Sequence, residues 1–261
     1  MLSHIVPEIM LKTLLVAGVL YASVAQSAIV RVDALNFTAD AGTITFSEFA
    51  VGTENPVYTP ENYDGGLGSP TVSFGGRFIG QSFGMDSACP AGAELSGCIM
   101  GLPSGPLTLS NELPNTIITG DDAVPTSPVL SGNPPFENAI SILFDIDLVG
   151  VGLDIGSFDF LGSTAVRVFN RQGDIIGLIN NEVGLGNEFF GLLTDDGLAA
   201  IAGLQILSVG AGPDGFGIDN LIFATADEVV EPNPVPLPAA LPLFASALGL
   251  GAIALRRKAV V

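Results

Sequence analysis

The chain has 261 residues with a net charge of −19, and its 33 glycines and 18 prolines are typical of short strands joined by turns. Residues 29–234 hold four basic and 26 acidic side chains, a net charge of −22. Such a surface repels phosphate backbones, which excludes nucleic acid as a partner. The acidity has two explanations: solubility in a salty medium, or the binding of divalent cations by some carboxylates.

Residues 1–28 are typical of a secretory signal peptide. Lys12 supplies the positive charge, residues 14–24 form the apolar core, and small residues follow. We expect export through the Sec translocon and cleavage by signal peptidase after Ala25 or Ser27. A retained N-terminal anchor is the alternative, although the apolar run is short for a membrane span.

The C-terminal end combines several features in order. An acidic, proline-containing linker over residues 225–234 precedes the motif VPLPA, formed by Val235, Pro236, Leu237, Pro238 and Ala239. Residues 237–255 carry no charge, and a helix of that length is about 28 Å long, close to the thickness of a bilayer core. A basic cluster follows, formed by Arg256, Arg257 and Lys258. Because basic residues stay on the cytoplasmic side, we expect the ectodomain outside the membrane.

This C-terminal pattern resembles the PEP-CTERM sorting tails of Gram-negative bacteria, in their VPLPA variant, over residues 235–258. In that family a membrane enzyme, an exosortase, recognises the tail and cuts near the motif. The resemblance implies an exosortase-type partner and an inner-membrane precursor. It also implies a mature protein at the cell surface or in an exopolysaccharide matrix. A plain C-terminal anchor is the alternative, but Pro238 and Pro242 disturb the start of the helix, as a cleavage site would require.

Residues 29–224 alternate apolar segments with turns rich in Gly, Pro, Asn and Asp. Strands are expected at 43–49, 71–74, 77–83, 107–109, 139–144, 149–155, 165–170, 175–180, 188–194, 200–209 and 217–224. The pair Gly75-Gly76 predicts a hairpin, residues 171–174 predict another turn, and residues 110–138 are expected to form a long loop. Short strands without helical crossovers predict an all-β ectodomain, an antiparallel β-sandwich or jelly roll.

The segments FFGLLTDDGLAAIAGLQIL and DGFGIDNLIFA resemble the β-sandwich ectodomains that precede such sorting tails. More loosely, they resemble the calcium-bearing jelly rolls of carbohydrate-binding modules. The resemblance covers residues 139–224 and implies a fold rather than an activity.

Most catalytic constellations are missing from the sequence. The only histidine, His4, lies in the leader, which excludes a Ser-His-Asp triad, a Cys-His pair and a histidine-based zinc site in the mature protein. Residues 29–234 contain no lysine, which excludes Schiff-base chemistry. Paired carboxylates remain able to hydrolyse glycosides. We therefore predict a protein that is not an enzyme, with a carboxylate-only secreted hydrolase as an alternative.

Two further groups of residues suggest structural roles. Cys89 and Cys98 are the only cysteines, and an isolated close pair in an exported protein predicts a disulfide. Tyr58 and Tyr63 lie in the acidic segment ENPVYTPENYDGG, which has two interpretations: a ligand-contacting loop or ordinary packing tyrosines. There is no tryptophan, which disfavours a sugar-binding platform.

Two carboxylates are candidates for a calcium site. Glu48 shares its strand face with Ile44 and Phe46, and Asp219 shares its face with Leu221 and Phe223. A carboxylate on an apolar face must be paired, hydrogen-bonded or bound to metal. If the first and last strands lie close together, Glu48 and Asp219 would share one calcium ion with backbone carbonyls. The alternatives are that each accepts loop N–H hydrogen bonds, or that the edge is solvated.

The sequence therefore predicts an exported structural or binding protein of the cell surface or extracellular matrix, delivered by exosortase-type sorting. The alternative is a calcium-dependent module that binds glycans of an exopolysaccharide. The missing tryptophan counts against the second reading, and the missing histidine restricts any hydrolase to carboxylate chemistry.

Overall fold

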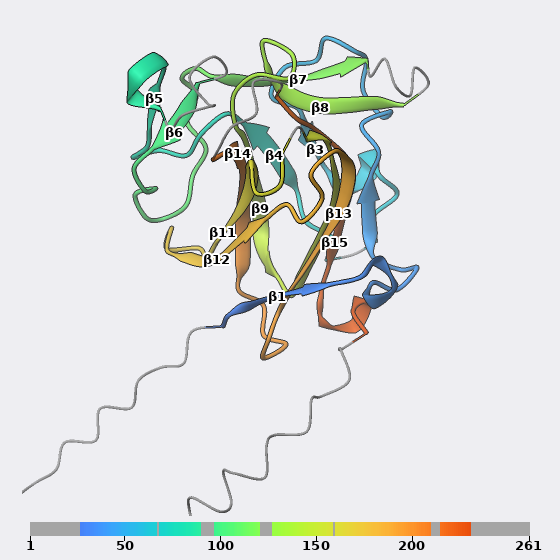
Figure 1. The fold of residues 1–261 in the computed structure, drawn as a ribbon. Helices are drawn as coiled ribbons and strands as arrows, with labels where there is room; N and C mark the ends of the chain where they lie inside the picture. The colour runs from blue at the N-terminus through green and yellow to red at the C-terminus, as the bar shows by residue number, and fades with distance from the viewer. Residues whose placement is uncertain are drawn as a thin grey trace, which may run out of the picture.

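The computed structural model describes residues 27–66, 68–89, 97–120, 127–158, 160–209 and 215–230. These residues form fifteen β-strands and four short 3-10 helices, and most of the strands belong to two antiparallel sheets that pack face to face (Figure 1). The prediction of an all-β antiparallel sandwich is confirmed. The four 3-10 helices are η1 (Ala34–Asn36), η2 (Pro60–Asn62), η3 (Asp86–Ala88) and η4 (Ala226–Glu228).

Several predicted segments lie outside the described residues. These are the signal peptide up to residue 26, the VPLPA motif, the span 237–255 and the basic cluster 256–258. In the described ranges, no helix has the length and apolar character needed to cross a membrane.

The first sheet has seven strands in the order β1-β13-β10-β15-β8-β7, with β2 also paired to β15. Its strands are β1 (Ile29–Val32), β2 (Gly42–Ile44), β7 (Asn115–Gly120), β8 (Pro128–Asn133), β10 (Gly150–Phe158), β13 (Gly186–Thr194) and β15 (Gly217–Ala224). The central strand β15 pairs on both sides, which places its first residues in the middle of the sheet.

The second sheet has six strands in the order β12-β11-β14-β9-β4-β3. They are β3 (Val57–Tyr58), β4 (Val72–Gly75), β9 (Ile140–Leu148), β11 (Thr164–Phe169), β12 (Ile175–Asn180) and β14 (Ile201–Ser208). A separate two-stranded ribbon consists of β5 (Ser82–Gly84) and β6 (Cys98–Met100).

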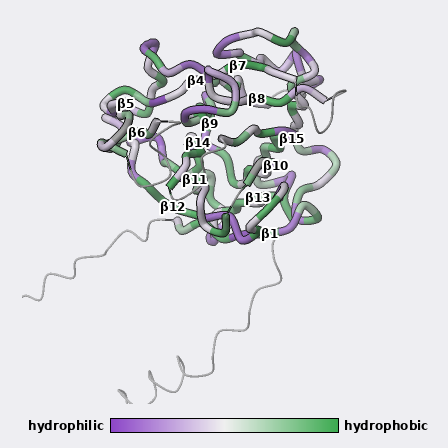
Figure 2. The backbone as a smooth tube through the Cα atoms, turned by 45° about the horizontal axis from the view of Figure 1, so that its top comes forward, coloured by the Kyte–Doolittle hydropathy of each residue, from purple (hydrophilic) through white to green (hydrophobic). Residues whose placement is uncertain are grey.

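The core lies between the two sheets because alternate residues of each strand point inward. Figure 2 shows hydrophobic segments along the central strands. Three aromatic rings of the core contact one another edge to face: the ring centroid of Phe46 lies 5.5 Å from that of Phe74 and 6.0 Å from that of Tyr58. None of the three side chains is more than 2% exposed. Aromatic pairs of this geometry add about 0.5–1.5 kcal/mol beyond the area that they bury.

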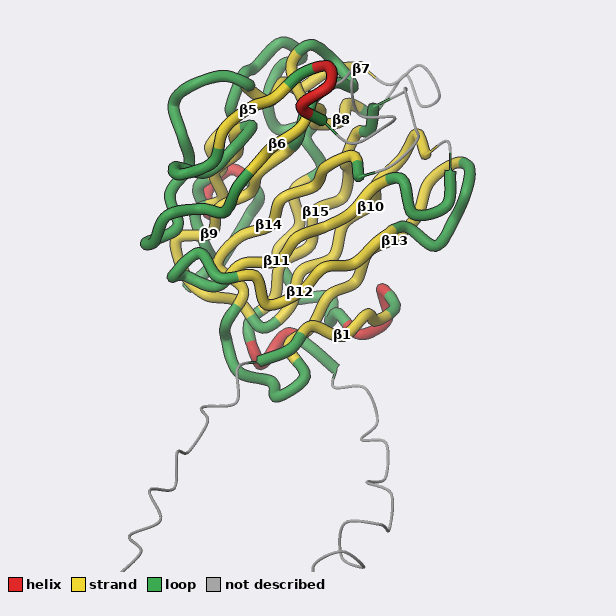
Figure 3. The backbone as a smooth tube through the Cα atoms, turned by 60° about the vertical axis from the view of Figure 1, so that its left-hand side comes forward, coloured by secondary structure: helices red, strands yellow, loops and turns green. Residues whose placement is uncertain are grey.

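The chain between β4 and β7 covers the outer face of the six-stranded sheet. Phe78 and Leu107 of this segment pack against Phe169 of β11. Ile99 of β6 packs against Leu207 of β14, and Figure 3 shows the ribbon at this end of the sheet. The outer face of this sheet is therefore occupied in part by the protein's own chain.

A buried pair of glutamines fixes this segment to the sheet. Gln81 Nε2 donates to Gln205 Oε1 at 3.0 Å, and Gln205 Nε2 donates back to Gln81 Oε1 at 2.9 Å. The Gln205 amide also donates to Ser141 Oγ, and the backbone N–H of Phe78 donates to Gln81. Because Gln205 is fully buried and Gln81 nearly so, these amides rely on one another for hydrogen bonds.

The predicted disulfide is present and closes a short loop of the same segment. Cys89 and Cys98 are bonded with their Cα atoms 5.6 Å apart, and Cys98 belongs to β6. A disulfide is typical of proteins outside the reducing cytosol, which agrees with the predicted export.

Replacing both cysteines with alanine is expected to lower the free energy of unfolding by at most about 2–3 kcal/mol, because the closed loop has only about ten residues. We expect the β5–β6 ribbon to loosen while the two sheets remain folded. Hydrogen exchange of Phe83 and Ile99, compared with that of β10, measures the difference. Equal loss of protection in the ribbon and in β10 would contradict this local role.

The two ends of the described chain meet at one end of the sandwich, as Figure 1 shows. The N–H of Thr38 donates to the carbonyl of Glu228 at 2.9 Å, and the N–H of Val230 donates to the carbonyl of Asn36 at 2.7 Å. Between them, Phe37 and Val229 form a single antiparallel bridge. The segment that follows the last strand is thereby joined to the segment that follows the first.

Several sequence predictions about strands are wrong. The strand predicted at 43–49 ends at Ile44, because Phe46 has a left-handed φ of 57°. The predicted hairpin at Gly75-Gly76 does not form: β4 pairs with β3 and β9, and the chain leaves the sheet after it. Gly76 serves close packing instead, since a Cβ there would lie 2.2 Å from the carbonyl oxygen of Pro114.

The predicted loop at 110–138 contains the paired strands β7 and β8. Their pattern is hard to recognise because polar side chains occupy buried positions. Thr116 is fully buried and its N–H donates to Asn55 Oδ1 at 2.8 Å, whereas the buried Ser131 hydroxyl donates to the carbonyl of Gly132. Hydrogen bonds within the neighbourhood thus replace the apolar contacts expected of a buried strand.

Candidate functional site

A cavity of about 440 Å³ opens on the outer face of the seven-stranded sheet, over β8, β10, β13 and β15. Its lining combines carboxylates, amides, a hydroxyl and an aromatic ring: Ser127, Val129, Phe136, Asp154, Ile155, Gly156, Asn187, Gly217, Asp219 and Asn220. Asp154 points outward because it alternates with the core residues Leu153 and Ile155 along β10. The cavity volume lies within the range usual for sites that bind small molecules.

A β-bulge in β15 brings the two carboxylates together. Gly152 pairs with Ile222 and Asp154 pairs with Asp219, so β15 has one more residue than β10 in this interval. The extra residue is accommodated at Asn220, whose φ is 48°. Asp154 and Asp219 become direct cross-strand partners on the outer face.

Because of this bulge, the strand face predicted for Asp219 is wrong. Ile218 and Leu221 both belong to the core although they are three residues apart. Asp219 therefore does not share a face with Leu221 and Phe223, as regular alternation would require. Its side chain faces the cavity instead, together with Asp154.

Both carboxylates accept hydrogen bonds from neighbouring residues. Asp219 Oδ2 accepts from the hydroxyl of Ser127 at 2.9 Å, and Asp219 Oδ1 accepts from the N–H of Asn220 at 2.7 Å. Asp154 Oδ2 accepts from Nδ2 of Asn220 at 2.9 Å. Asn220 therefore connects the two carboxylates and sets their positions.

Burial raises the pKa of Asp219 above its usual value. The hydrogen bonds from Ser127 and Asn220 oppose this rise, whereas the negative charges of Asp154 and Glu48 add to it. The ionised form of Asp219 is thus disfavoured in the folded protein by desolvation and by repulsion. A ligand that brings hydrogen-bond donors or positive charge would relieve both effects.

Glycines leave room for the ring and the amide that border the cavity. A Cβ at Gly156 would lie 2.4 Å from Asn187 Oδ1, so a side chain there would displace the amide. A Cβ at Gly217 would lie 3.4 Å from the ring of Phe136. Phe136 itself has a left-handed φ of 63°. The position of the Asn187 amide at the cavity therefore depends on the glycine at 156.

Glu48 lies outside any strand, so its predicted strand face is also wrong. After the turn at Phe46 the carboxylate folds back, and its Oε1 accepts from the N–H of Thr45 at 2.9 Å and from the Thr45 hydroxyl at 3.0 Å. Glu48 thus accepts a loop N–H hydrogen bond, the predicted alternative to calcium binding. Its Oε2 and the hydroxyl of Tyr58 are buried without a hydrogen-bond partner among the described residues.

The structure brings Glu48 into electrostatic range of Asp219, although not by the predicted geometry. The charge of Glu48 contributes to the raised pKa of Asp219, and burial together with this charge raises the pKa of Tyr58. In the ranges that the structure describes, no three His, Cys, Asp or Glu side chains are grouped so as to hold a metal ion. Calcium binding by Glu48 and Asp219 stays a prediction.

In the presence of a chelator, Asp219→Asn is expected to stabilise the protein at pH 7 by about 0.2–1 kcal/mol, because it removes one of two like charges in a cross-strand pair. The folded pKa of Asp219 is raised, so the stability from this group is complete below the unfolded pKa and is lost as pH rises through the folded pKa. The advantage of the variant should therefore shrink as pH falls towards 4. Urea unfolding at both pH values measures it.

Adding millimolar calcium distinguishes a calcium site at Glu48 and Asp219 from simple charge repulsion between Asp154 and Asp219. If Glu48 and Asp219 share a calcium ion, the melting temperature of the wild type rises with calcium, and Asp219→Asn and Glu48→Gln lose that rise. Magnesium and sodium chloride at equal ionic strength serve as controls for screening. An unchanged melting temperature between chelator and calcium would contradict the site.

A second cavity of about 540 Å³ lies at the other end of β15, where Phe223, Thr225 and Glu228 border it. Tyr63 also lines this cavity: its ring packs edge to face against Phe223, with centroids 4.9 Å apart, and its hydroxyl donates to the carbonyl of Pro70. Burial raises the pKa of Tyr63 to about 12. Tyr58 is fully buried and Tyr63 is partly buried against the core. Tyr58 is therefore a packing residue, and only part of the Tyr63 side chain faces the second cavity.

Asp154, Asn187 and Phe136 are members of the site that sequence reasoning missed. One signal was available: along GVGLDIG, Gly152, Asp154 and Gly156 alternate with apolar residues, which places a carboxylate between two glycines on one strand face. Small residues beside an outward carboxylate leave room for a ligand. The register that brings Asp219 opposite Asp154 depends on the bulge and carries no such signal.

The fold and the cavity define a β-sandwich domain with a polar pocket on one sheet. The sequence matches no protein-family model and no curated protein. Among solved structures, two mutant forms of the family 29 carbohydrate-binding module CBM29-2 are each 16% identical with a TM-score of 0.26. Each match covers 60% of this chain, with 99% of one module and 100% of the other.

Tailspike protein 4 of bacteriophage CBA120 is 12% identical with a TM-score of 0.24, covering 61% of this chain and 20% of the tailspike chain. TM-scores this low reflect a distant, partial match of the chain trace. The functions of those proteins are therefore not transferred to this chain.

Proposed function

We propose that this protein is an exported carbohydrate-binding protein and that the cavity over β8, β10, β13 and β15 receives the sugar. The observation that carries the proposal is the composition of one 440 Å³ cavity. Two carboxylates, two amides and a hydroxyl converge there beside an aromatic ring. A pocket with a few convergent polar groups on an apolar floor is typical of specific small-molecule binding.

Each chemical feature of the cavity matches a feature of a sugar. A hydroxyl group donates one hydrogen bond and accepts others, and carboxylates and amides are the planar partners that complement it. The Phe136 ring offers an apolar surface for the C–H groups of a pyranose. Sugar binding thus needs no tryptophan here, because the ring comes from a phenylalanine held at the cavity by a left-handed turn.

The two ends of the chain and the disulfide support a proposed site of action outside the cytoplasm. The leader, the VPLPA motif with its span and the basic cluster support export, exosortase-type sorting and a place at the cell surface or in an exopolysaccharide matrix. A polysaccharide in that matrix is the ligand that such a location would supply. Peptide mass spectrometry of the surface-exposed form tests the sorting proposal, since most molecules should lack residues after about Ala239.

Sugar binding is tested first with a glycan array and then by calorimetry of the purified protein with the sugars that bind. Phe136→Ala and Asp154→Ala are each expected to weaken binding at least about tenfold, because each removes a main contact from a small site. Phe160→Ala is the matched control, since Phe160 is 55% exposed and does not line the cavity. Unchanged affinity in both cavity variants would contradict this location.

A second candidate function is glycoside hydrolysis by the carboxylate pair. The observation that favours it is that Asp154 and Asp219 face each other across two strands in the cavity, where burial raises the pKa of Asp219, since glycosidases use a pair of carboxyl groups. Release of reducing ends from polysaccharides that bind distinguishes the two functions. A binding protein leaves them intact, whereas a hydrolase loses turnover in both Asp154→Asn and Asp219→Asn.

A further inference from the structure

Two like charges face each other at the floor of the cavity. Asp154 and Asp219 are direct partners on β10 and β15, and such pairs have Cβ atoms about 4.5–5.5 Å apart. Like charges in this arrangement repel each other and destabilise a sheet. A positive group placed between them would remove the repulsion and form two ion pairs in a partly desolvated site.

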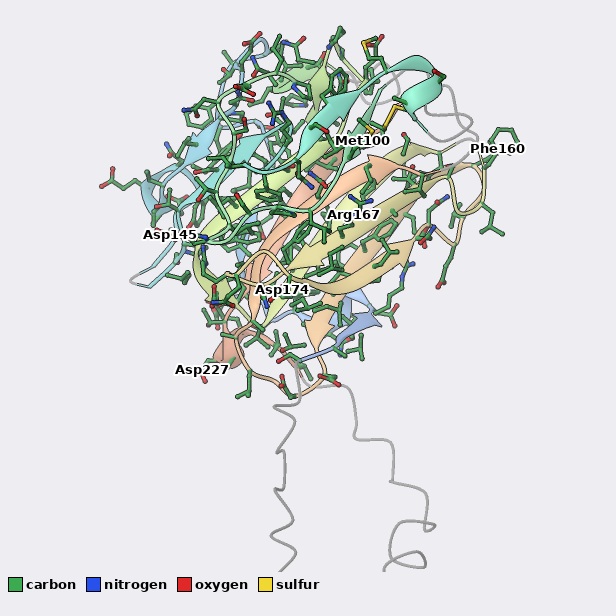
Figure 4. All side chains as sticks on the ribbon, turned by 90° about the vertical axis from the view of Figure 1, so that its left-hand side faces the viewer. Met100, Asp145, Phe160, Arg167, Asp174 and Asp227 are labelled. Atoms are coloured by element: carbon green, nitrogen blue, oxygen red, sulfur yellow. A yellow bond between two sulfur atoms is a disulfide. The ribbon has the colours of Figure 1, made fainter. Side chains whose placement is uncertain are left out.

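The described part of the protein does not supply that positive group. The cavity lining contains no arginine, lysine or histidine. Three of the four arginines in the described residues form ion pairs elsewhere: Arg31 with Glu188, Arg77 with Glu112, and Arg171 with Asp147. The fourth, Arg167, lies on the six-stranded sheet, opposite Gln205 (Figure 4). The described residues thus leave this position open to a positive group on a ligand.

The hydrogen-bonding groups of the cavity also favour a ligand that donates hydrogen bonds. Asp154 accepts one described hydrogen bond and Asp219 accepts two, whereas an ionised carboxylate has about four acceptor sites. The hydroxyl of Ser127 already donates to Asp219, and the side chain of Asn220 already donates to Asp154. The open positions are mainly acceptors. An ammonium group, with three donors and no acceptor, complements them better than a hydroxyl group does.

We propose that the cavity selects sugars with a free amine, such as a glucosamine unit, with the ammonium group between Asp154 and Asp219 and the ring against Phe136. This inference rests on the proposed function, because it names the class of sugar for the same cavity. The same negative charge disfavours sugar acids. The charge of −22 on residues 29–234 adds a long-range attraction for cationic polysaccharides.

Calorimetry of the purified protein at about pH 6, where the amine is charged, tests the inference with glucosamine, N-acetylglucosamine, glucose and glucuronate. Glucosamine is expected to bind at least about tenfold more tightly than glucose or N-acetylglucosamine, and glucuronate more weakly than glucose. Asp154→Asn, which keeps the shape of the side chain, should reduce the preference for glucosamine over glucose several-fold. Asp219→Asn is a second variant for the same test.

Asp227→Asn is the matched control, because it removes the same charge from an exposed residue beyond the far end of β15 (Figure 4). It should leave the preference unchanged. A control titration with putrescine separates recognition of an amino sugar from attraction of any cation. Thermal melting of each variant establishes that it is folded.

Each outcome has one meaning. Equal affinities for glucosamine and glucose would overturn the preference and leave sugar binding in place. Absence of binding by every sugar on the array and in the calorimeter would overturn the proposed function as well. Putrescine binding as tightly as glucosamine would overturn the selection of an amino sugar. A preference for glucosamine that survives in both asparagine variants would overturn the assignment of the ammonium group to the carboxylate pair.

Discussion

Replacing Phe46 with alanine is expected to lower the free energy of unfolding by about 3–5 kcal/mol, the usual effect of removing a buried phenylalanine ring. The ring is fully buried and makes edge-to-face contacts with Phe74 and Tyr58. In a domain of this size the melting temperature should fall by about 6–20 °C. Urea unfolding followed by circular dichroism measures the free energy directly.

The backbone at Phe46 allows a sharper version of this experiment. Glycine in an ordinary position is about 0.5–1 kcal/mol less stable than alanine, but a left-handed φ of 57° favours glycine. Phe46→Gly should therefore be at least as stable as Phe46→Ala. Phe49→Ala, at a partly buried neighbour in contact with Tyr58, is the control and should have a smaller effect. A glycine variant clearly less stable than the alanine variant would contradict the left-handed turn.

Replacing Gln205 with leucine is expected to lower the free energy of unfolding by about 3–4 kcal/mol. The substitution removes three buried side-chain hydrogen bonds and leaves the amide of Gln81 without its main partner. Because leucine has a similar volume, the loss comes from unsatisfied polar groups rather than from a void. The segment over the six-stranded sheet should loosen first, which hydrogen exchange at Phe78 reports.

A double-mutant cycle measures the interaction energy between Gln81 and Gln205 apart from their contacts with other residues. Gln81→Leu combined with Gln205→Leu should lose less than the sum of the two single substitutions, since neither amide is then left alone. Gln172→Leu, at an exposed position, is the control and should change stability by less than about 0.5 kcal/mol. Additive losses in the cycle would contradict the reciprocal hydrogen bonds.

Most strands in the second half of the sandwich could be predicted from the sequence, because each alternates or runs apolar over six to nine residues between clear turn signals. The strands β9 to β15 correspond to the predicted segments from 139 onward, with ends that differ by a few residues. Strands shorter than this could not be found reliably. β3 and β6 have two and three residues, and their pairing depends on partners far along the chain.

The site could be predicted only in part, because two local irregularities control it. A strand-face argument assumes regular alternation, and both Phe46 and Asn220 break it with a left-handed φ. Glu48 and Asp219 thus leave the faces that were predicted for them. The prediction that they lie near each other rested on the proximity of the first and last strands, and β2 does pair with β15. Asp154 became visible as a partner only once the register was known.

The meeting of the chain ends determines how mechanical load would enter the domain. In a protein held by its C-terminal segment, tension reaches Val230, whose N–H is bonded to Asn36, and passes to the bridge between Phe37 and Val229. The cavity carboxylate at Asp219 lies five residues before Ala224, about 17 Å away along β15. If the cavity binds a polysaccharide as proposed, a force between that ligand and the C-terminal segment would act along the length of β15. Strands loaded in this direction resist by shearing many hydrogen bonds at once rather than by opening them one at a time.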